Sequence, residues 1–416
     1  MSQRTSVLVT GSELVRGARR DANGPFLAEE LTRLGLEPAR IAIVGDEPDR
    51  LEDAIREGLG GELLVISGGL GPTHDDRTVE LLARAAGLEA PVDEELAREI
   101  EGISRSIAER FNRPYAEFEA GVRKQAVVPE GGRVIGIAGT APGLVVETGG
   151  AVAVVLPGPP PELRRLWRAA LDDEAVRRVI GLAQAPERRV LRTYGVSESA
   201  VAQALSDAGG EPEGVQATIC AHDGEIWAEL FGPGEGLATA LREALGPATF
   251  AEDDRPVEEI VLDLARGQGL TVGAAESCTG GLVAARLTSV PGASDVLRGA
   301  IVAYENDVKL AQLDVPEQTL GAHGAVSAET AAAMAEGARS SLGADVAVAV
   351  TGIAGPGGGT PEKPVGLINL HASGPDGELA RELHLPGDRE AIRRRATAAA
   401  LHLLRALLAQ SRHTSA

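Results

Sequence analysis

The stretch AAESCTGG, residues 274–281, lies between an apolar run typical of a buried strand and a second run typical of a packed helix. Ser277 is therefore expected at a strand-to-helix corner, where a side chain reaches the rim of a sheet and the first helical N–H groups have no helical acceptor. Gly280 and Gly281 keep bulk away from this turn. The corner predicts a serine nucleophile with oxyanion donors from the same turn, the alternative being that Ser277 or Thr279 only caps the helix.

Length, charge and cysteine content limit the possible functions. The 416 residues predict two or three domains. A formal charge of −21 argues against a nucleic-acid partner, because phosphate contacts need concentrated Lys and Arg. Cys220 and Cys278 are expected in different domains, without a disulfide. We expect a soluble, cytoplasmic protein without a membrane partner, since the start MSQRTSVLVTG has no signal-peptide core and no apolar run reaches the length of a membrane span.

The first predicted domain, residues 1–171, alternates strand and helix signals, which predicts an α/β fold with a parallel sheet and ligands at the carboxyl ends of its strands. One predicted strand runs into GGLGPTHDD at 68–76, whose N–H groups can converge on an anion. The neighbouring carboxylates of Asp75 and Asp76 at the next helix start suggest a divalent cation bridging to a diphosphate. The alternative is an ordinary helix start whose acids the helix dipole favours.

A second glycine loop spans residues 139–143 and precedes a further strand. The pattern then changes, and residues 172–252 predict a small α+β domain without evident chemistry. Cys220 and His222 alternate along one of its strands and do not make a metal site. The third predicted domain, 253–416, returns to α/β alternation.

Two features of the third domain predict a bound ligand. The loop TGIAGPGGGTPEKPVG, residues 351–366, has six glycines in sixteen residues, which we interpret as room for a ligand to approach the backbone rather than as packing material. Arg389, Arg393, Arg394 and Arg395 load the start of the last helix with positive charge, against the preference of the helix dipole. A bound phosphate would relieve that cost, and the alternative is a solvated face.

Lys309 is the candidate base for Ser277. No histidine has an obvious place in a Ser-His-Asp arrangement, whereas Lys309 follows a predicted strand end in a chain where lysine is scarce. Desolvation can lower the pKa of a lysine enough for it to take a hydroxyl proton, and Tyr304 is a possible relay. Cys278 is the rival nucleophile, because the start of a helix lowers a thiol pKa, but it should point to a different side from Ser277.

Seven motifs of the third domain together closely resemble the C-terminal domain of the CinA (competence/damage-inducible protein) family. They are AESCTGG at 275–281, VPGASD at 290–295, the segment 304–309, HGAVS at 323–327, TGIAGPGGG at 351–359, EKPVG at 362–366 and GDR at 387–389. In the first domain, GGLGPTHDD, the segment 13–23 and LPGPP at 156–160 resemble the family's N-terminal domain, which looks like a molybdopterin-binding fold.

The resemblance implies a nicotinamide mononucleotide amidohydrolase that releases ammonia and nicotinate mononucleotide without a cofactor. It implies Ser277 as the nucleophile, with Lys309 and Tyr304 as acid/base partners. The implied substrate-binding positions are Thr279, Gly280, Gly281, Asn306, Thr351, Gly352, Gly355, Gly357, Gly358 and Arg389.

The resemblance also implies a ligand site in the first domain and a homodimer. The implied ligand positions are Glu13, Asn23, Gly69, Gly71, Thr73, Gly139 and Thr140, with Asp75 and Asp76 for a divalent metal. Some relatives hydrolyse ADP-ribose there, but Arg20, Val122 and Gly136 depart from the residues usual in the family, so deamidation is the first expectation. Two alternatives stay open: a metal-dependent ADP-ribose pyrophosphatase in the first domain, and a non-catalytic pterin- or nucleotide-binding protein.

Overall fold

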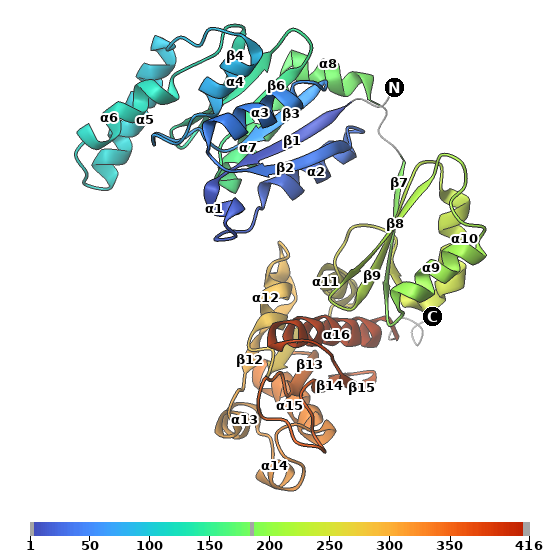
Figure 1. Ribbon diagram of the computed structural model, residues 1–416. Coiled ribbons are helices and arrows are strands. Elements are labelled where there is room, and N and C mark those ends of the chain that lie inside the picture. The colour runs from blue at the N-terminus through green and yellow to red at the C-terminus, as the bar shows by residue number, and fades with distance from the viewer. Residues whose placement is uncertain (1–3, 184–186, 411–416) are drawn as a thin grey trace. The chain divides into compact units, whose positions relative to one another are not determined.

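A computed structural model describes residues 4–183 and 187–410. The chain divides into two compact units, residues 1–186 and 187–416, each of which is described by itself (Figure 1). The ends of the predicted first and third domains, 1–3 and 411–416, and residues 184–186 of the predicted middle domain lie outside the described residues.

A six-stranded sheet in the order β2-β1-β3-β6-β5-β4 organises the first unit (Figure 1). Its parallel strands are β1 (Thr5–Thr10), β2 (Pro38–Val44), β3 (Leu63–Ser67) and β6 (Val152–Leu156). Two antiparallel strands, β5 (Ala141–Glu147) and β4 (Gly132–Ala138), extend one edge. The predicted parallel or mixed sheet is confirmed, and it is mixed.

Helices cover both faces of this sheet because the side chains of each buried strand alternate between two cores. In β3, Leu63 and Val65 belong to one core, and Leu64 and Ile66 to the other. The first core is completed by α2 (Asn23–Arg33), α7 (Pro160–Ala170) and α8 (Glu174–Leu182). The second is completed by α3 (Pro48–Gly58), α4 (Thr78–Ala86), α5 (Glu94–Arg110) and α6 (Ala116–Gln125). A short helix, α1 (Ser12–Val15), follows β1.

Three details of the first unit differ from the sequence predictions. His74, Asp75 and Asp76 lie in the loop before α4, which begins only at Thr78. The supposed free loop at 139–143 is the turn of the β4–β5 hairpin and the start of β5. The boundary predicted at residue 171 precedes α8, whose apolar face packs in the N-terminal core, so the first unit continues through α8.

The second unit contains two sheets. The antiparallel sheet β10-β7-β9-β8 comprises β7 (Arg188–Tyr194), β8 (Gln216–His222), β9 (Glu225–Phe231) and β10 (Thr249–Ala251), and α9 (Glu198–Asp207) and α10 (Glu235–Leu245) pack on it. The mixed sheet β12-β11-β13-β14-β15 comprises β11 (Val272–Glu276), β12 (Leu297–Val302), β13 (Val346–Gly352), β14 (Leu367–Gly374) and β15 (Gly377–His384). Of these, β12, β11 and β13 are parallel, so their carboxyl ends share one edge.

Helices also cover both faces of the second sheet. One face carries α11 (Val257–Gln268), α12 (Leu282–Thr288) and α16 (Arg389–Gln410). The other carries α13 (Asn306–Leu313) and α15 (Ala328–Leu342), with α14 (Glu317–His323) beside α15. The predicted fold class, α/β with a small α+β sheet between two larger parts of the chain, is confirmed.

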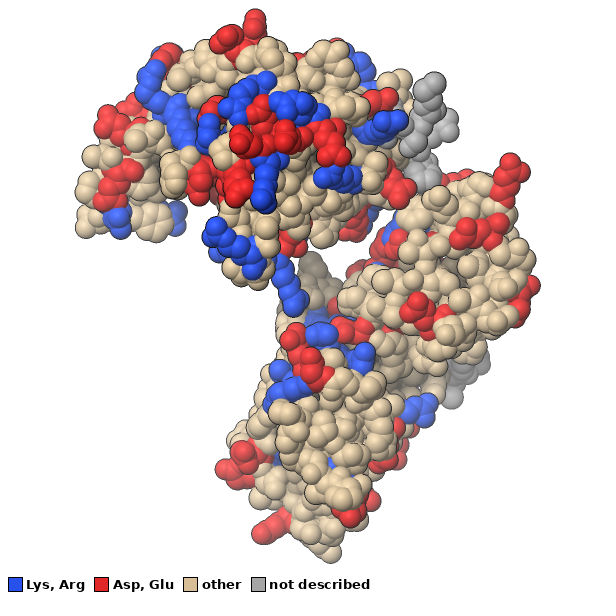
Figure 2. Space-filling view, in the orientation of Figure 1, with Lys and Arg blue, Asp and Glu red and all other residues tan. Residues whose placement is uncertain are grey.

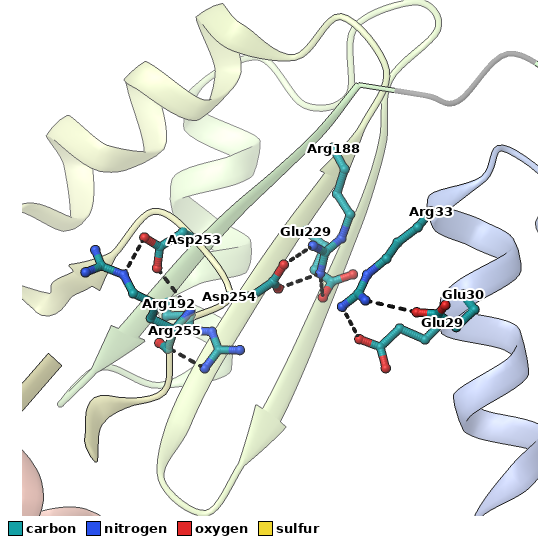
Figure 3. Close-up of polar contacts among 9 residues, drawn as sticks. All are labelled: Glu29, Glu30, Arg33, Arg188, Arg192, Glu229, Asp253, Asp254 and Arg255. Atoms are coloured by element: carbon teal, nitrogen blue, oxygen red, sulfur yellow. Dashed lines mark hydrogen bonds and ion pairs between the residues drawn. The ribbon is translucent and has the colours of Figure 1, made fainter. Parts of the chain in front are cut away.

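Ion pairs join the four-stranded sheet to the segment that leads into α11 (Figure 3). Arg188 on β7 bonds to Asp254 at 2.7 Å and to Glu229 on β9 at 2.8 Å. Arg192, four residues further along β7, donates to the carbonyl of Arg255 at 3.3 Å. Because the Arg188 side chain is only 25% exposed, these contacts are better shielded from water than ordinary surface pairs. They hold the segment after β10 against the four-stranded sheet.

Acidic and basic side chains are interspersed over the face drawn in Figure 2. Many form short-range pairs, such as Arg33 with Glu29 at 2.6 Å along α2. Within the ranges that the structure describes, no helix has both the length and the apolar character needed to cross a bilayer.

Candidate functional site

Ser277 lies at the rim predicted for it. The strand β11 ends at Glu276, and the N–H of Ser277 still donates to the carbonyl of Val350 on β13 at 2.9 Å. On the other side of β11, the N–H of Ala303 donates to the Glu276 carbonyl at 2.8 Å. Ser277 is 8% exposed, so its hydroxyl is close to the surface of the rim but largely withdrawn from water.

The start of α12 differs from the prediction, because a carboxylate of the chain itself occupies it. Glu276, fully buried, accepts hydrogen bonds from the N–H groups of Gly281 (2.9 Å), Val283 (3.1 Å) and Ala284 (2.9 Å). A buried anion at a helix N-terminus is stabilised by these donors and by the helix dipole. The N–H groups of Gly281, Val283 and Ala284 therefore face Glu276 and are not available to a substrate.

Lys309, on α13, is buried to 1% exposure and points back to the end of β12. Its Nζ donates to the carbonyls of Ala303 at 2.9 Å and Tyr304 at 3.0 Å. Burial lowers the pKa of Lys309, and the charge of Glu305 opposes that shift. Ser277 follows β11, and the amine of Lys309 bonds at the end of β12, the parallel neighbour of β11, so both residues lie at the same edge of the sheet.

Cys278 is a poor rival nucleophile in this environment. Its side chain is 5% exposed, and burial raises the pKa of its thiol to about 12, against a smaller opposing effect of Arg393. A thiol with such a pKa carries almost no thiolate at neutral pH. The geometry therefore favours Ser277 over Cys278.

The side chains of Tyr304 and Arg389 are in contact. The Tyr304 hydroxyl, which the sequence suggested as a proton relay, bonds to Arg389. The Tyr304 side chain is 53% exposed, and its hydroxyl accepts a hydrogen bond from Arg389 Nη2 at 2.8 Å. Arg389 Nη1 donates to the carbonyl of Gly355 at 2.7 Å. Only the backbone carbonyl of Tyr304 contacts Lys309. Arg389 thus ties the end of β12 to the glycine-rich loop.

The glycine-rich loop is partly packing material, contrary to the prediction. A Cβ at Gly352 would lie 2.6 Å from the Leu367 carbonyl, and one at Gly355 would lie 2.7 Å from Val365. Thr351 is also internal, since its hydroxyl donates to the Ala325 carbonyl at 2.6 Å. Gly357 has open space around its Cβ position, and Gly358, with φ of +84°, has only a methyl carbon of Ile353 near it. The part of the loop with room for a ligand, around Gly357 and Gly358, is therefore shorter than the glycine content of the loop suggests.

Arg393 is a site residue that the sequence did not single out among its neighbours. Its Nε donates to the Cys278 carbonyl at 3.1 Å, and its Nη2 donates to the Thr279 carbonyl at 2.7 Å, so it holds the turn after Ser277. Thr279 is fully buried, with a hydroxyl that has no partner among the described residues. A Cβ at Gly280 would lie 3.2 Å from Arg393 Nη2.

Two further predicted positions flank this turn. Asn306 is the exposed first residue of α13. Gly281, with φ of +97°, precedes α12, in a conformation that glycine adopts without strain.

A pocket of about 380 Å³ in the first unit brings most of the predicted N-terminal ligand residues together. Those that line it are Glu13, Gly69, Gly71, Thr140, Asp75 and Asp76. Asn23 supports the pocket from below, because its Nδ2 donates to Ser67 Oγ at 2.9 Å and to the Gly158 carbonyl at 2.7 Å. Gly139, at the hairpin turn, and Thr73 are not among its lining residues.

The carboxylates of Asp75 and Asp76 both accept a hydrogen bond from the Thr73 hydroxyl. The Thr73 hydroxyl bonds to Asp75 and, at 2.5 Å, to Asp76, whose Oδ2 also accepts from the Thr73 N–H at 2.9 Å. Within residues 4–183 and 187–410, no group of three His, Cys, Asp or Glu side chains is placed to hold a metal ion. Metal binding by Asp75 and Asp76 therefore stays a prediction.

Comparisons with known proteins define the class. Residues 6–176 match the family model of a probable molybdopterin binding domain, and residues 254–408 match that of the CinA C-terminal domain. A CinA-like protein from Mycolicibacterium paratuberculosis is 42% identical over 432 residues, covering 98% of this chain and 99% of that protein. One from Mycobacterium tuberculosis is 43% identical over 426 residues, with 98% of each covered. The chain belongs to the CinA family, as its motifs predicted.

A solved structure also matches part of the chain in sequence. The competence/damage inducible protein CihA from Agrobacterium tumefaciens is 43% identical, covers 38% of this chain and 99% of its own, and gives a TM-score of 0.36.

Proposed function

We propose that the C-terminal rim hydrolyses the carboxamide of nicotinamide mononucleotide, giving nicotinate mononucleotide and ammonia through an acyl-enzyme on Ser277. The observation that carries the proposal is the buried amine of Lys309, whose two hydrogen bonds both end on backbone carbonyls. A neutral amine has two N–H donors and one lone pair, so these carbonyls use both hydrogens and leave the lone pair for a hydroxyl proton. The lowered pKa of Lys309 favours the same neutral form.

The first half-reaction forms the ester. Lys309 takes the proton of Ser277 as Oγ bonds to the carboxamide carbon, and the amide oxygen becomes an oxyanion. The N–H groups of Cys278 and Thr279 are the candidate donors to that oxygen. The carbon–nitrogen bond then breaks, and ammonia leaves with the proton that Lys309 held.

The second half-reaction releases the acid. Water attacks the ester carbon and gives a proton to Lys309, the bond from that carbon to Ser277 Oγ breaks, and the proton returns to Oγ. Every atom of the water molecule is accounted for in the carboxylic acid product and the restored serine. No cofactor enters either step.

The phosphate of the substrate is assigned to the start of α16. Arg389 uses two of its five N–H groups on Tyr304 and Gly355, and its side chain is otherwise exposed. The remaining donors are free to bind a phosphate in the planar geometry that arginine provides. Gly357 and Gly358 leave room for the ligand to approach the backbone.

Replacing Ser277 tests the proposal. Ser277→Ala should lower ammonia release by at least about 10³-fold, because it removes the atom that forms the ester. Ser289→Ala is the matched control, since the Ser289 hydroxyl bonds only to the Arg286 carbonyl at the end of α12. Turnover by Ser277→Ala within about twofold of the parent chain would exclude Ser277 as the nucleophile.

A substrate panel separates this function from its alternatives. Nicotinamide mononucleotide, nicotinamide, glutamine and ADP-ribose would each be offered with and without added divalent metal. Ammonia from nicotinamide mononucleotide alone, independent of metal, is the expected pattern.

A second function is favoured by the pocket of the first unit: binding of a nucleotide or pterin. Its volume of about 380 Å³ lies in the range of small-molecule sites, and backbone of the glycine-rich loops lines it. Calorimetry with ADP-ribose should then give saturable binding without a product. Metal-dependent cleavage of ADP-ribose would instead support the pyrophosphatase.

A further inference from the structure

A second cavity lies wholly within the 187–416 unit, between the four-stranded sheet and the last helix. It has a volume of about 530 Å³, within the range of small-molecule sites. Tyr194 and Gly224 line it from the four-stranded sheet, and the other walls come from β14, β15 and α16. Its apolar surface is formed by Leu370, Leu379, Leu383, Leu385, Ala399, Leu403 and Ala406.

Three guanidinium groups line this apolar cavity and form no ion pair with a carboxylate of the described residues, although the charge of Glu225 acts on Arg405. Arg381, Arg395 and Arg405 form no ion pair with any described residue, and the only hydrogen bond among them runs from Arg395 to the Pro386 carbonyl. The nearby acids are already engaged: Asp223 pairs with Arg394 at 3.1 Å, and Glu225 bonds to His402 at 2.9 Å. In a chain with a net charge of −21, unpaired positive charge at this cavity is unusual.

Two buried polar atoms at the cavity have no hydrogen-bond partner among residues 4–183 and 187–410. They are Nδ1 of His402, a residue 2% exposed, and Nε of Arg405, and both residues line the cavity. His402 is held in place, since Tyr194 stacks on its ring at 3.8 Å between centroids. Buried polar groups are nearly always hydrogen-bonded, so a polar molecule beside these atoms would remove a cost that the chain alone does not remove.

We propose that this cavity binds a small organic anion, with its carboxylate or phosphate on the arginines and an apolar body against the leucines. The wall residues supply both halves of that chemistry, and a purely inorganic ion would leave the leucines uncovered. The site is separate from the amidase rim, which is formed by the carboxyl ends of β11 and β12.

The last helix connects the two sites. Arg389 and Arg393, at the start of α16, hold the glycine-rich loop and the turn after Ser277. Arg395, His402 and Arg405, further along the same helix, line the cavity. A ligand that shifts α16 would therefore act on the amidase rim, which makes the cavity suited to an effector.

Calorimetry on the full chain tests the binding, independently of any amide hydrolysis. The probes are phenyl phosphate, benzoate, inorganic phosphate and neutral benzyl alcohol. We expect saturable one-to-one binding of phenyl phosphate or benzoate, whichever acid group fits, at least about tenfold tighter than that of inorganic phosphate or benzyl alcohol. Binding of neither organic anion below about 10 mM would overturn the proposal.

Two variants locate the bound anion. Arg381→Gln should weaken the binding about tenfold, because it removes an exposed guanidinium that has no other polar partner. Arg405→Gln should do the same from the opposite wall. Arg389→Met, which removes the guanidinium assigned to the substrate phosphate, should leave the affinity unchanged.

The reverse pattern would place the anion in the amidase rim and overturn the proposal. So would a change in oligomeric state with Arg381→Gln in place of a change in affinity, since the cavity would then be an interface between copies of the chain.

Discussion

Around the ends of β11 and β12, a carboxylate, an amine and a serine are all withdrawn from water, whereas Asp75 in the first unit's pocket is exposed, Asp76 is half-buried, and both bond to a nearby threonine. Glu276 and Lys309 are buried to 0% and 1% exposure and are fully engaged with backbone groups. Burial lowers the pKa of Lys309, whereas the hydrogen bond from Thr73 lowers the pKa of Asp75. The two rims share glycine-rich loops, but they differ in how far their ionisable groups are withdrawn from water.

The largest difference between the two rims is expected when the lysine of each rim is replaced. Lys309→Met should lower ammonia release from nicotinamide mononucleotide by about 10³-fold, because a general base contributes that much. Lys124→Met is the matched control, since Lys124 also donates to a backbone carbonyl, that of Thr73 in the first unit. Equal activity of the two variants would remove the amine from the mechanism.

The two helix caps should differ in stability. Glu276→Gln should cost about 2 kcal/mol of unfolding free energy, because an amide cannot accept the three N–H bonds as the buried carboxylate does. Asp93→Asn should change stability little, since Asp93 caps α5 from an exposed position and asparagine is an equally good cap. Urea unfolding measures both, and a Glu276→Gln protein as stable as the parent would contradict the cap.

Activity should rise with pH. Protonated Lys309 cannot accept the serine proton, so kcat/KM should increase about tenfold per pH unit below the Lys309 pKa and level off above it. Burial lowers that pKa, so the plateau should begin below the ordinary lysine value. Between the two values the unfolded chain binds more protons than the folded chain, so folding stability should also rise with pH there.

A flat profile from pH 6 to 10 would exclude the lysine as the base, and Asp75→Asn, in the other rim, should leave the profile unchanged.

Arg389 should affect binding more than chemistry. Arg389→Met should raise KM for nicotinamide mononucleotide about tenfold, the loss expected for one charge-assisted contact to phosphate, with a smaller change in kcat. Nicotinamide riboside, which lacks the phosphate, should be cleaved equally by both proteins. A Met variant that discriminates between the two substrates as the parent does would show that the phosphate binds elsewhere.

The smallest effect is expected from removing metal. EDTA should leave ammonia release within about twofold, because none of the proposed steps uses a metal. The same treatment would abolish any ADP-ribose cleavage in the first unit. Loss of both activities in EDTA would show that ammonia release also depends on a metal, and it would contradict the difference proposed between the two rims.

Much of the fold follows from local sequence, and the exceptions have physical causes. The run at Leu63–Ser67 is apolar throughout, as a strand buried on both faces must be. The strand at Gly132–Ala138 was missed because it is partly exposed along most of its length and irregular near Gly136. The helix Glu174–Leu182 was missed although Asp173 is an N-cap with a side chain that accepts from the Ala175 N–H.

The candidate site was predictable only for residues whose place follows from the end of a nearby strand in the sequence. Ser277 and Lys309 each follow the end of a strand, and parallel neighbours bring such ends together. Glu276 could not be assigned, because its role depends on three N–H groups that converge on it only in the folded chain. Arg393 and Arg394 look alike in sequence, yet one holds the turn after Ser277 and the other pairs with Asp223.

The Glu276 carboxylate also bears on how inhibitors should be designed. A boronic acid that captures Ser277 would place its charged oxygen beside a helix end that is already neutralised, so the adduct would gain little from α12. Affinity is better sought by extending a compound toward the guanidinium of Arg389. Compounds that carry a phosphate isostere on that side should outperform those that elaborate the reactive group.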